Sequence, residues 1–282
     1  MNTNIAAVTI LYNPQEEFIK NVYSYNSNVS LLILIDNSEN PSPSLYDPFK
    51  NDPKVKVIFY HTNNGIAKAL NDAVKIASEN GFEWILTMDQ DSWFERKDVE
   101  KYLATFTQLT EKEKIAVIGP EFEIKNIFGI KKVTSLITSG CLINMNAFQV
   151  IGGFNEELFI DEVDHEYCYR ANLHGYAVLQ LQEIFLQHTL GNLKQVTTIL
   201  GKENKIKSLH SPIRLYYIVR NSLYVISMFK KAFPKEMGLK RKDLLVRIKN
   251  NLLYGKNKIS ILRHIMLGYI DYKRNRLGKY KA

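Results

Sequence analysis

Two aspartates separated by one residue, Asp89 and Asp91, form the strongest candidate site in this chain. They directly follow the apolar run Trp84–Met88, which predicts a buried strand. In open α/β sheets, ligands bind beyond the carboxyl ends of the strands. Two carboxylates this close can share one hard divalent cation, whose coordination shell commonly includes phosphate oxygens. The alternative is a solvated pair that caps a helix predicted over Arg96–Phe106, and the strand before the pair favours the metal.

A second group of carboxylates lies at the start of a predicted helix that ends near Gly175. Crowded like charges raise some carboxyl pKa values, and a carboxylate that does not bind metal can act as a general base. The alternative is that these residues only complement the helix dipole. The group consists of Asp161, Glu162, Asp164 and Glu166.

Polar loops after the first two predicted strands would meet the aspartate pair at one edge of the sheet. These loops are Thr9–Pro14 and Asp36–Ser38. An aspartate just past a strand can accept a hydrogen bond from a nucleotide base, and Asn or Ser can hold ribose or diphosphate. Taken alone, Asp36–Ser38 is better explained as a turn or a helix cap.

Asn63, Asn64 and Gly65 precede a predicted helix whose first two turns carry Lys68 and Asn71. Helix N-termini favour anions, although a plain helix start with glycine in a tight turn explains the same residues. The chain has neither the glycine fingerprint of nicotinamide-binding folds nor a P-loop. A nucleotide bound here would be held in another way.

His188 follows an apolar stretch, and a lone histidine is more often structural than a ligand. The aspartate pair gives a reason to assign it as a ligand, because a neutral imidazole can complete a divalent metal site.

The elements that must position these residues alternate between short β-branched runs and helical patterns, which predicts βαβ units and a mostly parallel sheet. We expect strands over Ile5–Leu11, Ser30–Ile35, Val55–Tyr60, Glu83–Met88, Ile115–Gly119, Cys141–Asn144 and Tyr176–Glu183. We expect helices over Glu16–Tyr25, Gly65–Asn80 and Ala147–Ile151. Gly191–Ser211 is polar and unpatterned, which predicts an irregular connection.

Charge divides the chain at about residue 211. The 282 residues are 45% apolar and 23% charged, which excludes collagen-like and disordered classes. Residues 1–211 carry 19 Lys/Arg and 26 Asp/Glu, a net charge of −7, whereas residues 212–282 carry 18 and 3, a net charge of +15. We therefore expect a catalytic domain over 1–211 and a basic helical extension over 212–282.

Two cysteines are too few for a disulfide framework, and the N-terminus lacks a secretion signal, so we expect a cytoplasmic protein. No apolar run is long enough to cross a bilayer. The extension predicts two amphipathic helices that lie on the inner face of the membrane. The alternatives are that they pack on the catalytic domain or on a second copy of the chain, as in a homodimer.

Seven blocks in this order resemble inverting family 2 glycosyltransferases of the GT-A fold, and among these the bacterial rhamnosyltransferases of surface polysaccharide synthesis. The blocks are T-I-L-Y-N (9–13), I-D-N-S (35–38), N-N-G-I-A-K-A-L-N (63–71), D-Q-D-S (89–92), T-S-G-C-L-I-N (138–144), G-G-F-N-E-E-L-F-I-D-E-V-D-H-E-Y-C-Y-R-A (152–171) and Q-H-T-L-G (187–191).

The resemblance implies a Rossmann-like α/β domain and a role for each matched residue. Asp164 falls where the family places its catalytic base, and Asp89, Asp91 and His188 would hold Mg²⁺ or Mn²⁺. The acceptor and sugar pocket would include Ser139, Gly140, Asp161 and Glu166. The nucleotide-sugar would contact Thr9, Tyr12, Asn13, Asp36, Asn64, Gly65, Asn71, Asp89 and Gln90.

The implied reaction moves L-rhamnose from dTDP-L-rhamnose to a saccharide or a lipid-linked saccharide. Gln90 is typical of the rhamnosyl branch but does not identify the sugar, so UDP-galactofuranose, UDP-glucose and UDP-galactose remain alternative donors. A different class, an RNA-binding protein with a basic tail, fits less well because the acidic body would repel nucleic acid.

Overall fold

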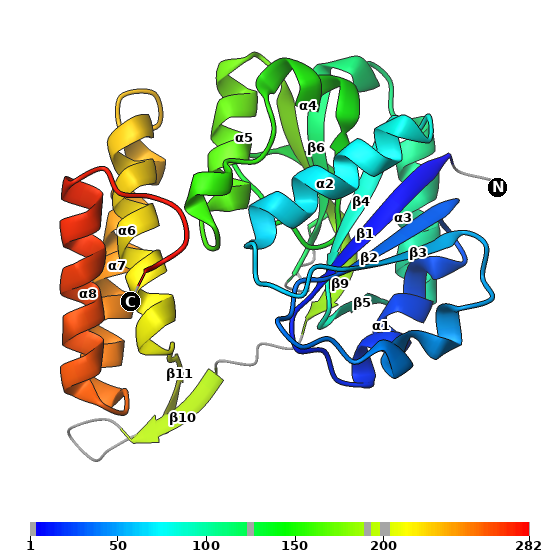
Figure 1. The fold of residues 1–282 in the computed structure, drawn as a ribbon. Helices are drawn as coiled ribbons and strands as arrows, with labels where there is room; N and C mark the ends of the chain where they lie inside the picture. Colours follow the sequence, from blue (N-terminus) through cyan, green and yellow to red (C-terminus); the bar gives the residue numbers. More distant parts are fainter. Residues whose placement is uncertain (1–3, 123–126, 189–192, 198–203, 282) are drawn as a thin grey trace. The chain divides into compact units, whose positions relative to one another are not determined.

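The computed structural model describes residues 4–122, 127–188, 193–197 and 204–281 (Figure 1). The chain divides into two compact units: Met1–Phe159 with Val163–Thr189, and Ile160–Glu162 with Leu190–Ala282. The division falls before the boundary at residue 211 that charge suggests, and it places Ile160–Glu162, which include two of the four grouped carboxylates, in the second unit.

The first unit is built on a mixed sheet in which four neighbouring strands are parallel. These four are β3 (Val55–Phe59), β2 (Leu31–Asp36), β1 (Ile5–Leu11) and β4 (Trp84–Asp89), and the sheet continues through β8 (Cys141–Asn144), β6 (Ile115–Glu121), β9 (Ala177–His188) and β5 (Ser92–Phe94). A short strand, β7 (Ile130–Lys132), also pairs with β9. This arrangement confirms the predicted α/β class.

Helices cover both faces of this sheet. Side chains of α1 (Glu17–Asn26), of α3 (Arg96–Gln108) and of the 3-10 turn η1 (Pro43–Phe49) pack against Ala7, Leu32 and Leu34 in one core cluster. Helix α2 (Ile66–Glu79) packs over β1, β2 and β4 (Figure 1). The remaining helical elements of this unit are η2 (Lys112–Lys114), α4 (Met145–Ile151), η3 (Glu156–Leu158) and α5 (Val163–Leu173).

The sequence predictions for these elements agree with the structure within a few residues, with three differences. β5 and β7 are only three residues long, too short for a periodicity to reveal them. β9 runs on to His188, beyond the predicted end at Glu183.

The expected irregular connection over Gly191–Ser211 is wrong in part, because this stretch contains an antiparallel hairpin of β10 (Leu193–Thr197) and β11 (Asn204–Ser208). Residues 189–192 and 198–203, which belong to the same stretch and to the last resemblance block, lie outside the described residues.

In the part that the structure describes, the second unit contains three helices, α6 (Pro212–Phe229), α7 (Pro234–Tyr254) and α8 (Lys258–Lys273). They pack around a small apolar core that includes Leu215, Leu244 and Ile261. Arg220 is fully buried in α6, where its Nη1 donates to the Gly278 carbonyl oxygen at 2.7 Å. The predicted helical extension is therefore confirmed as helical, and part of its apolar surface packs within the extension.

Candidate active site

Strand pairing brings the two aspartates and the histidine together. Asp89 is the last residue of β4, and Asp91 lies between β4 and β5. β5 pairs antiparallel with β9 in a register that places Ser92 opposite His188. The short strand β5 thus connects the carboxyl end of the parallel sheet to the distant end of β9.

The resulting cluster has the composition of a divalent metal site. One ligand atom from each of Asp89, Asp91 and His188 lies within 4.8 Å of the other two. His188 Nδ1 is 3.3 Å from Asp91 Oδ1 and 2.8 Å from Ser92 Oγ. Two carboxylates and an imidazole fit Mg²⁺ or Mn²⁺. Because β5 separates the pair from α3, whose N-cap is Glu95, the aspartates do not cap that helix.

Gln90 joins this cluster to the loop after β1. Its Oε1 accepts a hydrogen bond from the Tyr12 backbone N–H at 2.8 Å, and its carbonyl oxygen accepts one from Asn21 Nδ2 at 2.8 Å. Asn13, which follows Tyr12, adopts a positive φ of 46° and donates its N–H to Ser38 Oγ at 2.7 Å. The metal cluster and the loops at Tyr12–Asn13 and Ser38 are therefore connected by hydrogen bonds.

The loop before α2 is tied to the same edge. Asn37 Oδ1 accepts from the Asn64 backbone N–H at 2.8 Å. Gly65 has a φ of +83°, and a Cβ there would lie 2.6 Å from the Phe159 carbonyl oxygen. That oxygen also accepts from the Ile66 N–H at 2.8 Å. Glycine is required here both by the backbone conformation and by the close approach of Phe159.

Three residues expected to contact the nucleotide have side chains occupied within the protein. Thr9 is fully buried with its hydroxyl 2.5 Å from that of Tyr25. Asp36 is fully buried as well, and its carboxylate accepts from the Ser38 N–H at 3.0 Å and from the Tyr46 hydroxyl at 2.6 Å. Burial and the Asp36 carboxylate both raise the pKa of Tyr46.

Asn71 is the third of these residues. Its amide binds both the N–H and the carbonyl oxygen of Phe154, each at 2.9 Å, and it donates to Glu156 at 2.9 Å. Asn71 therefore anchors the segment around residue 154. Thr9 likewise packs in the core. Asp36 forms a local turn with Ser38, which is the alternative explanation given for Asp36–Ser38 above.

Two residues of the expected sugar pocket lie next to the metal cluster. Ser139 Oγ accepts a hydrogen bond from the Asp89 backbone N–H at 3.1 Å. Gly140 donates its N–H to the Thr87 carbonyl oxygen at 2.7 Å. The turn at Ser139–Gly140 therefore supports the backbone that carries Asp89.

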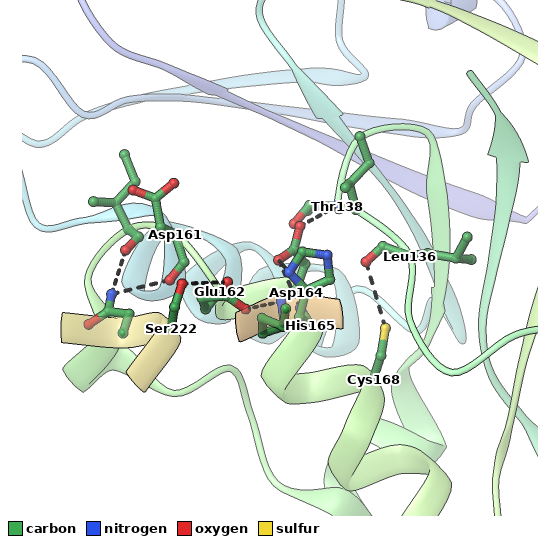
Figure 2. Close-up of polar contacts among 12 residues, drawn as sticks. Leu136, Thr138, Asp161, Glu162, Asp164, His165, Cys168 and Ser222 are labelled. Atoms are coloured by element: carbon green, nitrogen blue, oxygen red, sulfur yellow. Dashed lines mark hydrogen bonds and ion pairs between the residues drawn. The ribbon is translucent and has the colours of Figure 1, made fainter. Parts of the chain in front are cut away.

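Asp164 lies in the first turn of α5 and is held by backbone groups (Figure 2). Its Oδ2 accepts from the Thr138 N–H at 3.2 Å, and its Oδ1 accepts from the His165 N–H at 2.8 Å. The His165 imidazole Nδ1 lies 3.5 Å from the same Oδ1. The Asp164 side chain is one-fifth exposed.

The other acidic residues of this segment form ion pairs inside the protein. Glu166 is buried, and both of its oxygens accept from Arg170, at 2.7 and 2.9 Å. Arg170 also donates to the carbonyl oxygens of Ile151 and Gly153. Through Arg170, Glu166 connects the start of α5 to the turn after α4, and its expected role in the sugar pocket stays a prediction. Asp161 pairs with Arg214, at 2.8 and 2.9 Å.

The two cysteines are structural. Both are buried, and Cys168 Sγ lies 3.9 Å from the Leu136 carbonyl oxygen (Figure 2). Burial raises the pKa of the Cys168 thiol to about 12 and that of Cys141 as well. Neither thiol is ionised near neutral pH, so neither supplies a thiolate nucleophile.

Two residues that contact the candidate site were not predicted from the sequence: Ser92, which contacts His188, and Tyr46, which contacts Asp36. Ser92 could have been suspected, because it completes the D-Q-D-S block. Tyr46 lies in the 3-10 turn η1, ten residues after its partner Asp36, and its sequence context carries no comparable signal.

Comparison with known proteins supports a transferase. Residues 8–132 match the family model for glycosyl transferase family 2. The dTDP-rhamnosyl transferase RfbF of Shigella flexneri is 30% identical over a 313-residue alignment that covers all of both chains.

Solved structures with low identity show the fold. S. aureus TarS matches with a TM-score of 0.57 and 15% identity over 96% of this chain, which spans 49% of TarS. TarS 1–349 in complex with UDP-GlcNAc matches with a TM-score of 0.56 and 15% identity, covering 97% of this chain and 82% of that one. GalNAc-T7 with UDP, GalNAc and Mn²⁺ matches with a TM-score of 0.59 and 13% identity, covering 97% and 58%.

These neighbours confirm the GT-A architecture expected from the sequence. Because the chain is 30% identical to RfbF over its full length and residues 8–132 match the family model, it belongs to the family 2 glycosyltransferases.

Proposed function

We propose that this enzyme is an inverting rhamnosyltransferase that uses dTDP-L-rhamnose and acts in cell-surface polysaccharide synthesis. The observation that carries the proposal is the Asp89, Asp91 and His188 cluster, which lies at the sheet edge where the loops of residues 12–13, 37–38 and 64–65 meet. Full-length similarity to the dTDP-rhamnosyl transferase RfbF supports this choice of donor.

In the proposed reaction, an acceptor hydroxyl oxygen bonds to the anomeric carbon while the bond from that carbon to the diphosphate breaks. Asp164 takes the hydroxyl proton, because its carboxylate is held at the start of α5 and its side chain is partly exposed. Asp89, Asp91 and His188 would hold Mg²⁺ or Mn²⁺, which when bound neutralises charge on the diphosphate leaving group. A positioned base contributes about 10²–10⁴ in rate.

A donor panel tests this function. Purified protein is incubated with dTDP-L-rhamnose, UDP-galactofuranose, UDP-glucose or UDP-galactose, each with Mn²⁺, with Mg²⁺ or with EDTA, and release of the nucleoside diphosphate is measured. We expect release from dTDP-L-rhamnose that depends on the divalent ion. Turnover of a UDP-sugar alone would reassign the donor, and turnover that EDTA does not change would remove the metal role.

We also propose that the second unit binds the inner face of the cytoplasmic membrane, where a lipid-linked saccharide acceptor would be met. None of the helices in the described ranges could cross a bilayer. The helices α6, α7 and α8 form an apolar groove of about 710 Å³ whose lining includes Leu245, Ile248 and Met266. Leu245 and Met266 are 60% and 54% exposed.

Charge complementarity selects a lipid surface as the occupant of this groove. The helices α7 and α8 and the turn between them also carry exposed basic residues: Arg241, Lys242, Lys249, Lys256, Lys258 and Arg263. Each basic residue near an anionic surface contributes about 1 kcal/mol, and an apolar face buried among the headgroups adds to that. A second copy of this chain would present the same positive charge and repel the first.

A further inference from the structure

The segment Ile160–Glu162 lies directly before the helix that carries Asp164, and its backbone is strained. Asp161 and Glu162 have φ angles of 65° and 69°, and the preceding Phe159 has φ 65° and ψ −62°. Non-glycine residues are unfavourable in this region of backbone conformation and persist there only where surrounding contacts hold them. Contacts with other residues must therefore hold Ile160–Glu162 in this conformation.

The contacts that hold it come from α6 and α7. Arg214 Nε and Nη2 donate to the two carboxylate oxygens of Asp161 at 2.8 and 2.9 Å. Asn221, which is fully buried, donates to the carbonyl oxygens of Ile160 and Asp161 at 2.7 and 3.2 Å. The Asp161 side chain and the backbone of Ile160 and Asp161 are thus held by residues of α6.

Glu162 is bound from two helices. Its Oε1 accepts from Ser222 Oγ of α6 at 3.1 Å (Figure 2), and its Oε2 accepts from Lys240 Nζ of α7 at 2.6 Å. The side chains of Glu162 and Lys240 are only 11% and 12% exposed. Removing one partner of so sheltered a pair leaves the other charge poorly solvated, which makes this contact more important than an exposed ion pair.

We infer that Arg214, Asn221 and Lys240 are positioning residues that set the location of the Asp164 carboxylate through Ile160–Glu162. Glu162 is bonded covalently to Val163, the first residue of α5, and Asp164 is the next residue. A displacement of the segment therefore moves the start of α5. This inference rests on the proposed role of Asp164 as the base.

The inference also gives Asp161 a role other than the sugar-pocket contact expected from the sequence. Its two oxygens both accept from Arg214, and its side chain is 15% exposed. A misplacement of about 1 Å can lower a rate by 10², so loss of these anchors should affect turnover before it affects donor binding.

The experiment compares full-length Arg214→Gln and Lys240→Gln with Lys235→Gln, a control on an exposed basic residue of the same helix α7. Kinetic constants are measured with the donor that the panel identifies, with Mn²⁺, and dTDP affinity is measured by calorimetry. We expect kcat to fall about 10- to 100-fold in both anchor variants, while KM, dTDP affinity and the control stay within about threefold.

Two further variants keep the test decisive if an anchor variant folds poorly. Arg214→Lys retains the positive charge and should recover part of kcat. Glu162→Lys combined with Lys240→Glu restores an ion pair, so its kcat should be higher than that of either single variant. Equal falls in kcat, dTDP affinity and melting temperature, or an unchanged kcat in folded Arg214→Gln and Lys240→Gln, would overturn the inference. Asp164→Asn in the same assay separates the two ideas, because retained activity there would overturn the base assignment itself.

Discussion

At the scale of single residues, the account depends most on Asp164. Asp164→Asn keeps the shape of the side chain and one acceptor oxygen, but it cannot take a proton from the acceptor. We expect donor turnover to fall by about 10² or more, while dTDP affinity stays within a few-fold. Parallel assays of Asp161→Asn and Glu166→Gln check the placement, since a larger loss of kcat in either would move the base elsewhere in this acidic segment.

The sequence predicted that Asp89, Asp91 and His188 lie together, because the aspartate pair follows a buried strand and gives the histidine a reason to be a ligand, and the structure confirms that the three are close. It was less reliable about which polar side chains face outward. Thr9 shares the alternation of Ile5, Ala7 and Leu11, which all point into one core cluster, so its burial could have been read from the strand. The Asp36 contact with Tyr46 depends on how the 3-10 turn η1 folds, and no periodicity reveals that.

At the scale of elements, the loop before α2 gives a stability prediction. Gly65 and Gly81 both have positive φ, at +83° and +78°, but only Gly65 has neighbours, with Phe159 atoms closer than 3 Å to an added Cβ. Alanine at either site carries a left-handed penalty of about 1–2 kcal/mol. We expect Gly65→Ala to cost clearly more, because the Phe159 backbone must also move.

Urea unfolding of the two glycine variants measures the difference in free energy of unfolding. If Gly65→Ala and Gly81→Ala are equally destabilised, the close approach between Gly65 and Phe159 is not present in solution.

Helices and strands with a clear hydrophobic periodicity were predicted from the sequence. The pairing between strands that lie far apart in the sequence was not. The parallel strands β1 to β4 follow from alternating apolar runs and helices. The register of β5 against β9 joins residues 92 and 188, and such long-range pairing leaves no local pattern in a three-residue strand. This register is nevertheless what brings His188 to the aspartates.

At the scale of the whole molecule, the separation of charge makes membrane binding testable. The protein should sediment with anionic vesicles at low salt and be released as salt rises, because exposed Lys and Arg residues provide much of the attraction. Leu245→Ser combined with Met266→Ser should weaken binding, since both side chains are exposed at the groove. Val150→Ser, at an exposed apolar position of the first unit, is the matched control.

Vesicle binding that is the same for the groove variant and for Val150→Ser would place the contact elsewhere. Failure of the unaltered protein to bind anionic vesicles at low salt would favour a soluble acceptor.

The central claim is that Asp89, Asp91 and His188 bind the ion that holds the nucleotide diphosphate. Calorimetric titration of dTDP with and without Mn²⁺, into the unaltered protein and into Asp91→Ala, tests it most directly. We predict that Mn²⁺ tightens dTDP binding to the unaltered protein and has no such effect on Asp91→Ala, whose metal-free affinity stays within a few-fold. The same Mn²⁺-dependent gain in both proteins, or no gain in the unaltered one, would contradict the assignment.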